Sequence, residues 1–410
     1  MKLSKSIIFG SISLLLMFNI YNAINFLFHI SMARMLSVVN YGILATLFSI
    51  VYISGMFSES IQLVITKYAS KESNNGKLKN LLRKSISKSL RVSVLLFIFY
   101  LFLSFLLSYL LDIKYSLVVL TGLIIFTAFL SPTARGILQG RKMFNSLGLN
   151  MIIESSFKLL LAILLVFIGW EVYGAIIATI LAVLISFLFS FVSLRKIISS
   201  KEQKAATHGI YSYTAPVFIV IFSTLIFYSL DVIIAKIVFE DAIAGYYAVA
   251  SILAKTIFLG TQPISKAMFP LSVQTNEKKK RSSGIFFTSL LILTLVIVAA
   301  LVIFYFFPEF LVKLFSGKSL IQSASILFYL GVAISILSVA NLVSLYKISK
   351  GNLKNYCFLP ISILIEIFLL SYFSGNLLQF SFALISASAI FLWVSVVLLQ
   401  NETINNHTST

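Results

Sequence analysis

Ionisable side chains inside long apolar stretches are the residues of this chain that could do chemistry. Lys158, Asp231 and Lys255 each lie among mostly apolar neighbours. A charged side chain at the centre of a bilayer costs about 2.5 kcal/mol or more, so it usually faces a wet cavity, pairs with a partner or extends to the membrane surface. A buried cation could bind an anionic ligand, and a buried carboxylate could carry a proton. We therefore expect ligand binding and ion exchange at these positions.

Cations in or at the ends of the apolar stretches are the candidates for binding an anionic substrate in a cavity. Lys255 lies deep in its stretch and is the first candidate. The full set is Lys255, Lys266, Lys158, Arg34, Arg135 and Lys67. Lys67 could instead be a signal for membrane orientation, and Arg34 and Arg135 could extend to the membrane surface. Four amides would line the same cavity: Asn22, Asn25, Gln62 and Gln262.

Asp231 is the first candidate for ion coupling. No cation stands three or four residues away from it in the sequence, so a helix gives it no charged neighbour. Burial favours the neutral form of a carboxyl group, which makes Asp231 a candidate proton-binding site. Asn22, Asn25 or a lysine from another helix could instead satisfy it structurally.

Three other carboxylates lie in apolar stretches. Glu154 and Lys158 stand four residues apart, so on a helix they share a face and could neutralise each other instead of serving in coupling. Glu59 lies on nearly the same helical face as Gln62, and Glu366 has no evident partner in the sequence. We take Glu154 and Glu59 as further coupling candidates.

Motifs of soluble-enzyme chemistry are missing from the sequence. No glycine-rich loop carries a Walker lysine, and no paired histidine motif or conventional nucleophile arrangement occurs. One cysteine, Cys357, and three scattered histidines offer no ligand spacing for a metal ion. We therefore expect no enzymatic activity, no catalytic residue, no metal site and no cofactor, apart from coupling to H⁺ or Na⁺.

Twelve apolar stretches are long enough to hold these residues within a membrane. A spanning helix needs about 20 mostly apolar residues, and such segments occur at 7–30, 40–66, 92–111, 115–134, 147–169, 172–194, 211–236, 243–270, 285–307, 321–346, 356–374 and 377–399. Hydrophobic residues make up 59% of the chain and charged residues 11%. These proportions predict an all-α integral membrane protein with about 12 transmembrane helices.

Positive charge alternates between the loops and predicts the orientation. Lysine and arginine gather at 2–5, 67–91, 135–142, 195–204, 278–281 and 347–354, whereas the intervening loops carry few cations. The positive-inside rule therefore places the first set, and both termini, in the cytoplasm, which predicts a multi-pass protein of the cell membrane. Insertion and anionic membrane lipids explain the net charge of +19, so we do not expect nucleic acid as a partner.

The helices divide evenly around a polar segment. We expect an N-terminal six-helix bundle at 1–194, a cytoplasmic linker at 195–210, a C-terminal six-helix bundle at 211–400 and a short cytoplasmic tail at 401–410. Similar order in the two halves, such as Tyr41-Gly42 and Gly245-Tyr246 between apolar runs, indicates a weak internal repeat. Two pseudo-symmetric bundles around a central cavity are the usual construction of an alternating-access transporter.

Two loop segments have the periodicity of amphipathic helices. In 77–91, leucines and one isoleucine recur at helical spacing while most of the cations lie elsewhere around the helix. This pattern favours a helix in the cytoplasmic membrane interface, as an electrostatic anchor or a substrate contact. The segment 309–324 could lie in the outer interface in the same way.

Several segments together resemble the polysaccharide transporter family, whose members include O-antigen flippases and move lipid-linked oligosaccharides across membranes. The matching segments are Asn25–Gly42 (NFLFHISMARMLSVVNYG), Ser131–Phe144 (SPTARGILQGRKMF) with the following Glu154 and Lys158, and Asp231–Pro270. The family belongs to the superfamily of multidrug, oligosaccharidyl-lipid and polysaccharide exporters. The resemblance implies a V-shaped pair of bundles whose cavity cations, at positions such as Arg34, Arg135, Lys158, Lys255 and Lys266, contact a diphosphate and sugars.

The resemblance leads us to expect a flippase that translocates polyprenyl-diphosphate oligosaccharide repeat units for surface polysaccharide biosynthesis. Its partners would be the lipid-linked oligosaccharide, membrane lipids and other glycan assembly proteins. A cation-coupled multidrug extruder of the same superfamily is an alternative, although its cavity should favour carboxylates over cations. A membrane glycan polymerase or ligase, or a scaffold subunit, is the alternative from another class. The outer loops are too short to hold a polymerase acceptor site.

Overall fold

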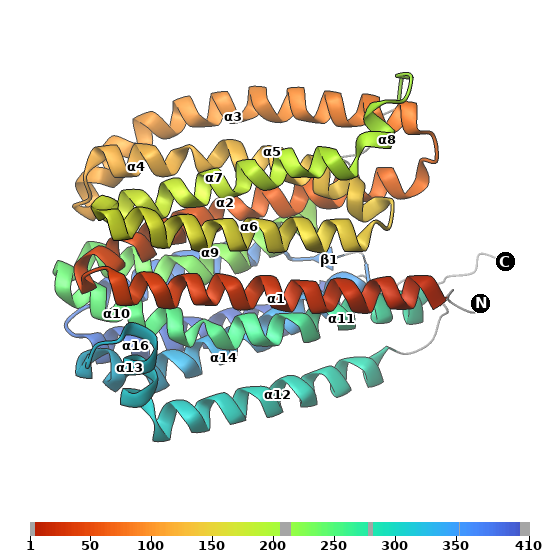
Figure 1. Ribbon diagram of the computed structural model, residues 1–410. Helices are drawn as coiled ribbons and strands as arrows, with labels where there is room; N and C mark the ends of the chain where they lie inside the picture. Colours follow the sequence, from red (N-terminus) through yellow and green to blue (C-terminus); the bar gives the residue numbers. More distant parts are fainter. Residues whose placement is uncertain (1–4, 206–214, 278–281, 352, 402–410) are drawn as a thin grey trace. The chain divides into compact units, whose positions relative to one another are not determined.

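The chain forms two helical units. The computed structural model describes residues 5–205, 215–277, 282–351 and 353–401 (Figure 1). The units are Met1–Tyr213 and Thr214–Thr410. The basic run 278–281, most of the tail 401–410 and the end of the predicted linker at 206–210 lie outside the described residues.

The first unit consists of helices alone within its described residues. Its elements are α1 (Lys5–Met35), α2 (Val38–Lys71), α3 (Asn75–Leu111), α4 (Tyr115–Gly122), α5 (Ile124–Gly140), α6 (Phe144–Leu165), the short wide helix η1 (Val166–Trp170), α7 (Glu171–Ser193) and α8 (Arg195–Ile198). Helix α1 packs on α6, α2 packs on α5, and α6 packs on α7. Gly169 in η1 has a φ of 93°, a left-handed conformation that glycine tolerates, where the chain passes from α6 into α7.

The second unit is helical apart from one short strand pair. Its elements are α9 (Ala215–Val238), α10 (Asp241–Ala254), α11 (Thr256–Glu277), α12 (Ser283–Phe306), α13 (Pro308–Ser316), α14 (Ile321–Ser349), β1 (Leu353–Lys354), α15 (Phe358–Tyr372), α16 (Leu377–Trp393), η2 (Val394–Leu398) and β2 (Gln400–Asn401). Strands β1 and β2 pair antiparallel. Helix α14 packs against α16, α11 and α10, and α9 packs against α15.

The predicted all-α, multi-pass membrane fold is confirmed. Nine helical segments in the described part of the chain are long and apolar enough to cross a membrane. One of them, Phe144–Ser193, combines two predicted stretches, and the apolar helix Phe358–Tyr372 is shorter than a typical span. Each of the twelve predicted stretches falls largely on helix wherever it is described. Two of the stretches are interrupted, at Leu123 between α4 and α5 and at Lys255 between α10 and α11.

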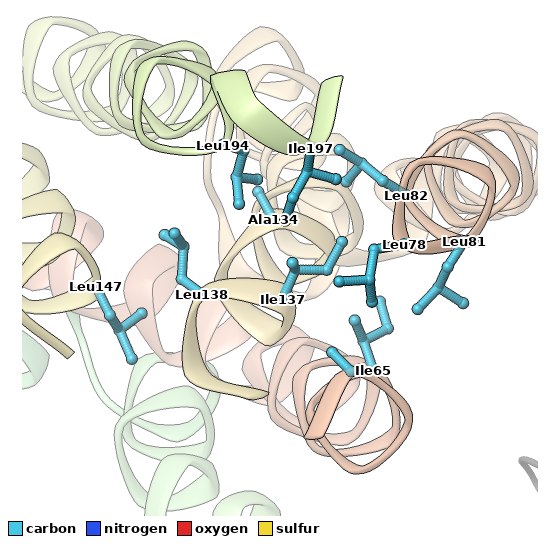
Figure 2. Packing of buried hydrophobic residues seen from close by; sticks show 11 residues of the cluster. Ile65, Leu78, Leu81, Leu82, Ala134, Ile137, Leu138, Leu147, Leu194 and Ile197 are labelled. Atoms are coloured by element: carbon cyan, nitrogen blue, oxygen red, sulfur yellow. The ribbon is translucent and has the colours of Figure 1, made fainter. Parts of the chain in front are cut away.

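The amphipathic segment 77–91 forms the beginning of α3 and packs against protein. Leu78, Leu81 and Leu82 are buried in a cluster with residues of α2, α5 and α8 (Figure 2). Ile86 packs against this cluster. The prediction that this apolar face lies in the membrane interface is therefore wrong for these residues, because helical periodicity does not distinguish a protein neighbour from lipid. The cations of the segment lie on the remaining faces of α3, where Arg83 is exposed.

The outer segment predicted at 309–324 contains the short helix α13. Val312 and Phe315 are buried within the unit, whereas Phe310 and Leu314 are 63% and 52% exposed. Residues four apart lie on one face of a helix, so α13 presents an apolar edge away from its own unit. This arrangement is suited to a helix in a membrane interface.

The polar segment after α8 is attached to the beginning of α3. Asn80 Nδ2 donates to Glu202 Oε1 at 2.6 Å, and Arg83 Nη1 lies 3.1 Å from Glu202 Oε2. Lys79 Nζ donates to the Ser200 carbonyl at 3.0 Å, and the backbone N–H of Gln203 donates to the Gly76 carbonyl at 3.2 Å. A Cβ atom at Gly76 would lie 2.2 Å from the Lys201 carbonyl oxygen, so only glycine permits this approach. In the predicted linker 195–210, residues 195–198 form α8, and residues 199–205 form a strap on the first unit.

Acid should release this strap. The hydrogen bond from Asn80, followed by that from Arg83, lowers the pKa of Glu202 in the folded protein. A depressed carboxyl pKa contributes stability that is present above the unfolded pKa of about 4.3 and is lost as the pH falls through the folded value. Amide hydrogen exchange of 199–205, corrected for intrinsic rates, should therefore show protection at neutral pH and lose it below about pH 4. E202Q should show reduced protection at neutral pH as well, and wild-type protection in that variant would contradict the role of Glu202.

Candidate functional site

Each unit contains a buried cluster of polar and charged side chains. We name the first the Arg135 cluster; it consists of Arg135, Asn150, Glu154 and Ser186, with Lys158 one helical turn beyond Glu154. We name the second the Asp231 cluster; it consists of Asp231, Tyr247, Ser251 and Lys255, with Glu366 close by. Both clusters lie on helices that the sequence predicts to span the membrane, where burial makes such groups costly.

The Arg135 cluster joins α5, α6 and α7. Arg135 Nη2 lies 2.5 Å from Glu154 Oε2, and its Nε donates to Asn150 Oδ1 at 2.8 Å. Ser186 Oγ donates to the same Glu154 oxygen at 3.0 Å. One guanidinium thus serves two acceptors on α6, and the carboxylate receives two donors, which is the arrangement that makes a buried ion pair tolerable.

This geometry corrects two expectations. Arg135 does not extend to the membrane surface, because its side chain is only 13% exposed and is held by Glu154 and Asn150. Glu154 forms its ion pair with Arg135 and not with Lys158, although Lys158 shares its helical face. A carboxylate that already has a guanidinium partner is a weaker coupling candidate than the sequence indicates.

Lys158 lies beside α1 and α2 in an aromatic environment. Its Nζ donates to Asn25 Oδ1 at 3.0 Å, and Asn25 Nδ2 donates to the Tyr21 carbonyl. The ammonium lies 4.1 Å from the centre of the Phe28 ring and 4.9 Å from that of Phe48. Aromatic faces attract cations, so these contacts hold the charge without neutralising it.

Lys158 keeps unused capacity to bind an anion. Its residue is 8% exposed, and within the described part of the chain it forms no ion pair. An ammonium group has three N–H donors, and the hydrogen bond to Asn25 uses one of them. Arg135 and Lys158 are cations and Glu154 is an anion, so the three side chains together have a net positive charge. This excess charge is suited to an anionic group such as a phosphate.

The Asp231 cluster joins α9 to the break between α10 and α11. Lys255 Nζ lies 2.7 Å from Asp231 Oδ1, while Ser251 Oγ and Tyr247 Oη donate to Oδ2 at 2.6 and 3.1 Å. Asp231 and Lys255 are 1% and 2% exposed. Lys255 also lies 4.8 Å from the centre of the Tyr228 ring. Asp231 is therefore a fully hydrogen-bonded carboxylate with its own cation.

The two leading candidates of the sequence thus neutralise each other. Asp231 is satisfied by a lysine from another helix, which is the structural alternative to an unpaired proton-binding carboxylate. Lys255 is buried as predicted, but its charge is directed to Asp231, so an anionic substrate would have to compete for it. Of the buried lysines in the candidate set, Lys158 is the one that forms no ion pair among the described residues.

Glu366 on α15 lacks a hydrogen-bond partner altogether within the described residues. It is 0% exposed, and neither of its carboxyl oxygens has a partner. Its helix packs against α9, which carries Asp231, the partner of Lys255. Burying a neutral polar group without a hydrogen bond costs about 2–7 kcal/mol, and an isolated ionised carboxylate costs far more. Such a group needs an explanation in a native structure.

The other predicted site residues are more accessible. Arg34 is exposed in the last turn of α1, and Lys67, Glu59 and Lys266 are exposed on α2 and α11. The half-buried amide of Gln62 donates to Gln139 Oε1 at 2.8 Å, which links α2 to α5. Asn22 and Gln262 are half-buried, and Asn25 accepts a hydrogen bond from the candidate cation Lys158.

Comparison with solved structures establishes the fold. An inward-facing multidrug resistance MATE family transporter of the MOP superfamily aligns with a TM-score of 0.74 at 14% identity over 92% of both chains. The lipid II flippase MurJ in an inward closed conformation aligns with a TM-score of 0.71 at 15% identity, covering 95% of this chain and 86% of MurJ. A MOP superfamily transporter from Pyrococcus furiosus aligns with a TM-score of 0.60 at 15% identity, covering 94% and 93%.

Comparison of the sequence with models of protein families finds a family that matches most of the chain. The profile of the family described as "Polysaccharide biosynthesis protein" matches residues 8–276, which contain the whole Arg135 cluster and the whole Asp231 cluster. Comparison with curated protein sequences finds no significant match. Glu366 lies beyond the matched residues.

Proposed function

Because the chain belongs to the polysaccharide biosynthesis protein family, we propose that it is a flippase for lipid-linked oligosaccharides. It moves polyprenyl-diphosphate oligosaccharide repeat units from the cytoplasmic to the outer leaflet for surface polysaccharide biosynthesis. The fold is that of MOP superfamily transporters, so the movement proceeds by alternating access. The protein resides in the cell membrane with both termini in the cytoplasm, and its partners are the lipid-linked substrate, membrane lipids and other glycan assembly proteins.

The observation that supports this proposal most directly is the unneutralised ammonium of Lys158. A diphosphate is dianionic or close to it, and charge-assisted hydrogen bonds to it are about twice as strong as neutral ones. Lys158 offers two N–H donors that have no partner among the described residues, and Asn25 and the two aromatic rings fix its position. Sugars of the repeat unit would be bound by the half-buried amides, while the polyprenyl chain remains in lipid.

A multidrug extruder is the alternative that the fold permits. Such a protein would attract cationic drugs with buried carboxylates that no protein cation neutralises. In the first unit the buried Glu154 is bonded to Arg135, whereas the buried Lys158 forms no ion pair among the described residues. The balance of free charge in the first cluster therefore favours an anionic substrate.

Deleting the gene in its native host tests the proposal. The lipid-linked glycan pool should accumulate as complete repeat units that face the cytoplasm, and the surface polymer should be lost. Complementation with the wild-type gene should restore both. An unchanged pool together with altered sensitivity to cationic drugs would contradict the proposal and favour the extruder.

A further inference from the structure

The unpartnered carboxyl group of Glu366 is a feature of the second unit that substrate binding does not explain. It is completely buried on α15, between helices that offer it no hydrogen-bond donor among the described residues. Ionised carboxylates buried in proteins are paired, whereas a neutral carboxyl can be buried at a much smaller cost. In this buried arrangement Glu366 therefore fits the neutral, protonated form.

The charged groups around Glu366 belong to one ion pair. Helix α15 packs against α9, α16 and η2. Helix α9 contributes Asp231, to which Lys255 is bonded at 2.7 Å, while α16 and η2 contain no titratable residue. Helix α9 also carries Tyr228, whose ring centre lies 4.8 Å from Lys255 Nζ, and Lys236, which pairs with Asp241. Two carboxyl groups thus have one ammonium group between them. Asp231 is bonded to this ammonium, and it also accepts hydrogen bonds from Tyr247 and Ser251.

We propose that Glu366 is a proton-exchange site and that Lys255 is a tethered cation shared between Glu366 and Asp231. With a proton on Glu366, the cluster consists of Asp231⁻, Lys255⁺ and a neutral acid, so its net charge is zero and it can be sealed from water. Loss of the proton to solvent leaves two carboxylates and one ammonium. The net charge becomes negative by one, and Lys255 moves toward a position between the carboxylates.

This charge difference makes proton exchange depend on conformation. A cluster with net charge is stabilised by contact with water, whereas a neutral cluster is stable when buried. The sealed arrangement therefore requires the proton, and the deprotonated form favours an open arrangement. The inference rests on the proposed transport function, which it deepens by assigning proton coupling to α9, α10 and α15.

The position of the Lys255 ammonium also indicates that the coupling ion is a proton and not a metal cation. Lys255 Nζ occupies the position next to Asp231 that a free monovalent cation would need. We therefore expect sodium to leave the thermal stability of the purified protein unchanged when it replaces choline at equal ionic strength. A sodium-dependent stabilisation that disappears in D231N would show that a metal ion, and not the proton, is the ligand of the cluster.

Infrared difference spectroscopy tests the protonation state without any substrate or access to the buried group. The wild-type spectrum minus that of E366Q at neutral pH should contain the carbonyl band of a protonated carboxylic acid. A difference spectrum with only carboxylate bands would overturn the proposal. E366D provides a second comparison if E366Q folds poorly, because it shifts the band of this residue without removing it.

The sharing of Lys255 is tested in a D231N background. Without a carboxylate at position 231, Lys255 should pair with Glu366, which then gives up its proton. The spectrum of D231N minus that of D231N/E366Q should therefore contain carboxylate bands in place of the acid band. An acid band that persists in this background would contradict the shared cation. Because no glycan is present, failure here would leave the flippase proposal intact, and failure of flipping would leave this result intact.

Discussion

Replacing Lys158 with methionine should reduce export of the lipid-linked glycan about tenfold or more while leaving the protein at least as stable as the wild type. A hydrogen bond to a charged group contributes about 1.5–3 kcal/mol, and each 1.4 kcal/mol corresponds to about a factor of ten in binding. The stability should not fall, because Lys158 forms no ion pair among the described residues and its removal leaves no buried carboxylate without a cation.

Export in the deletion host and thermal unfolding of the purified variant measure the two effects separately. K158R keeps the charge and should retain part of the activity, although its larger group has to fit between Phe28 and Phe48. K84M is a matched control, because Lys84 is an exposed lysine at the beginning of α3. Normal export by K158M, or a loss of export that follows a loss of stability, would contradict the assignment of Lys158 to the substrate.

The second large effect is expected in the stability of the Asp231 cluster. K255M should destabilise the protein by about 3–5 kcal/mol, because it leaves a buried carboxylate without its cation. The double variant D231N/K255M should recover much of this loss, since it removes both charges together. Equilibrium unfolding in detergent measures both variants and gives the coupling energy of the pair.

The ion pair between Lys236 and Asp241 provides the internal control for this prediction. Its aspartate side chain is 46% exposed, whereas that of Asp231 is 2% exposed. K236M leaves a carboxylate that water can solvate, so its cost should be well below that of K255M. Equal losses in the two variants would show that the burial of Asp231 does not determine its dependence on Lys255.

The membrane helices could be predicted from the sequence because length and hydropathy are local properties. The interruption at Lys255 could not, since an apolar run continues on both sides of it. The periodicity of 77–91 correctly predicts a helix, but the partner of its apolar face is α2, α5 and α8. Amphipathicity indicates that a face is buried and leaves open whether protein or lipid covers it.

The candidate site was predictable along each helix and unpredictable between helices. Two stripes with a spacing of four residues carry most of its polar groups: Asn150, Glu154 and Lys158 on α6, and Tyr247, Ser251 and Lys255 along α10. The same spacing is the sequence signal for Asn150, Tyr247 and Ser251, which are absent from the predicted site. Their partners, Arg135 for Glu154 and Asp231 for Lys255, come from other helices.

Competition between partners explains the remaining error. The spacing rule pairs Glu154 with Lys158, which stand one turn apart. In the structure the Arg135 guanidinium takes Glu154, because its planar donors reach Glu154 and Asn150 at the same time. A single sequence does not show which helix faces which, so it cannot weigh a partner on another helix against one on the same helix.

Translocation by the purified protein in liposomes tests directly whether the protein is a flippase that uses Lys158. A lipid-diphosphate oligosaccharide placed in one leaflet should become accessible in the other when the wild-type protein is present, as measured by an impermeant enzyme that cleaves or labels the exposed sugar. Liposomes with K158M should show translocation close to that of protein-free liposomes, and K84M should behave as the wild type. Absence of translocation by the wild-type protein would contradict the flippase function, and equal translocation by K158M would contradict the role of Lys158 in binding the substrate.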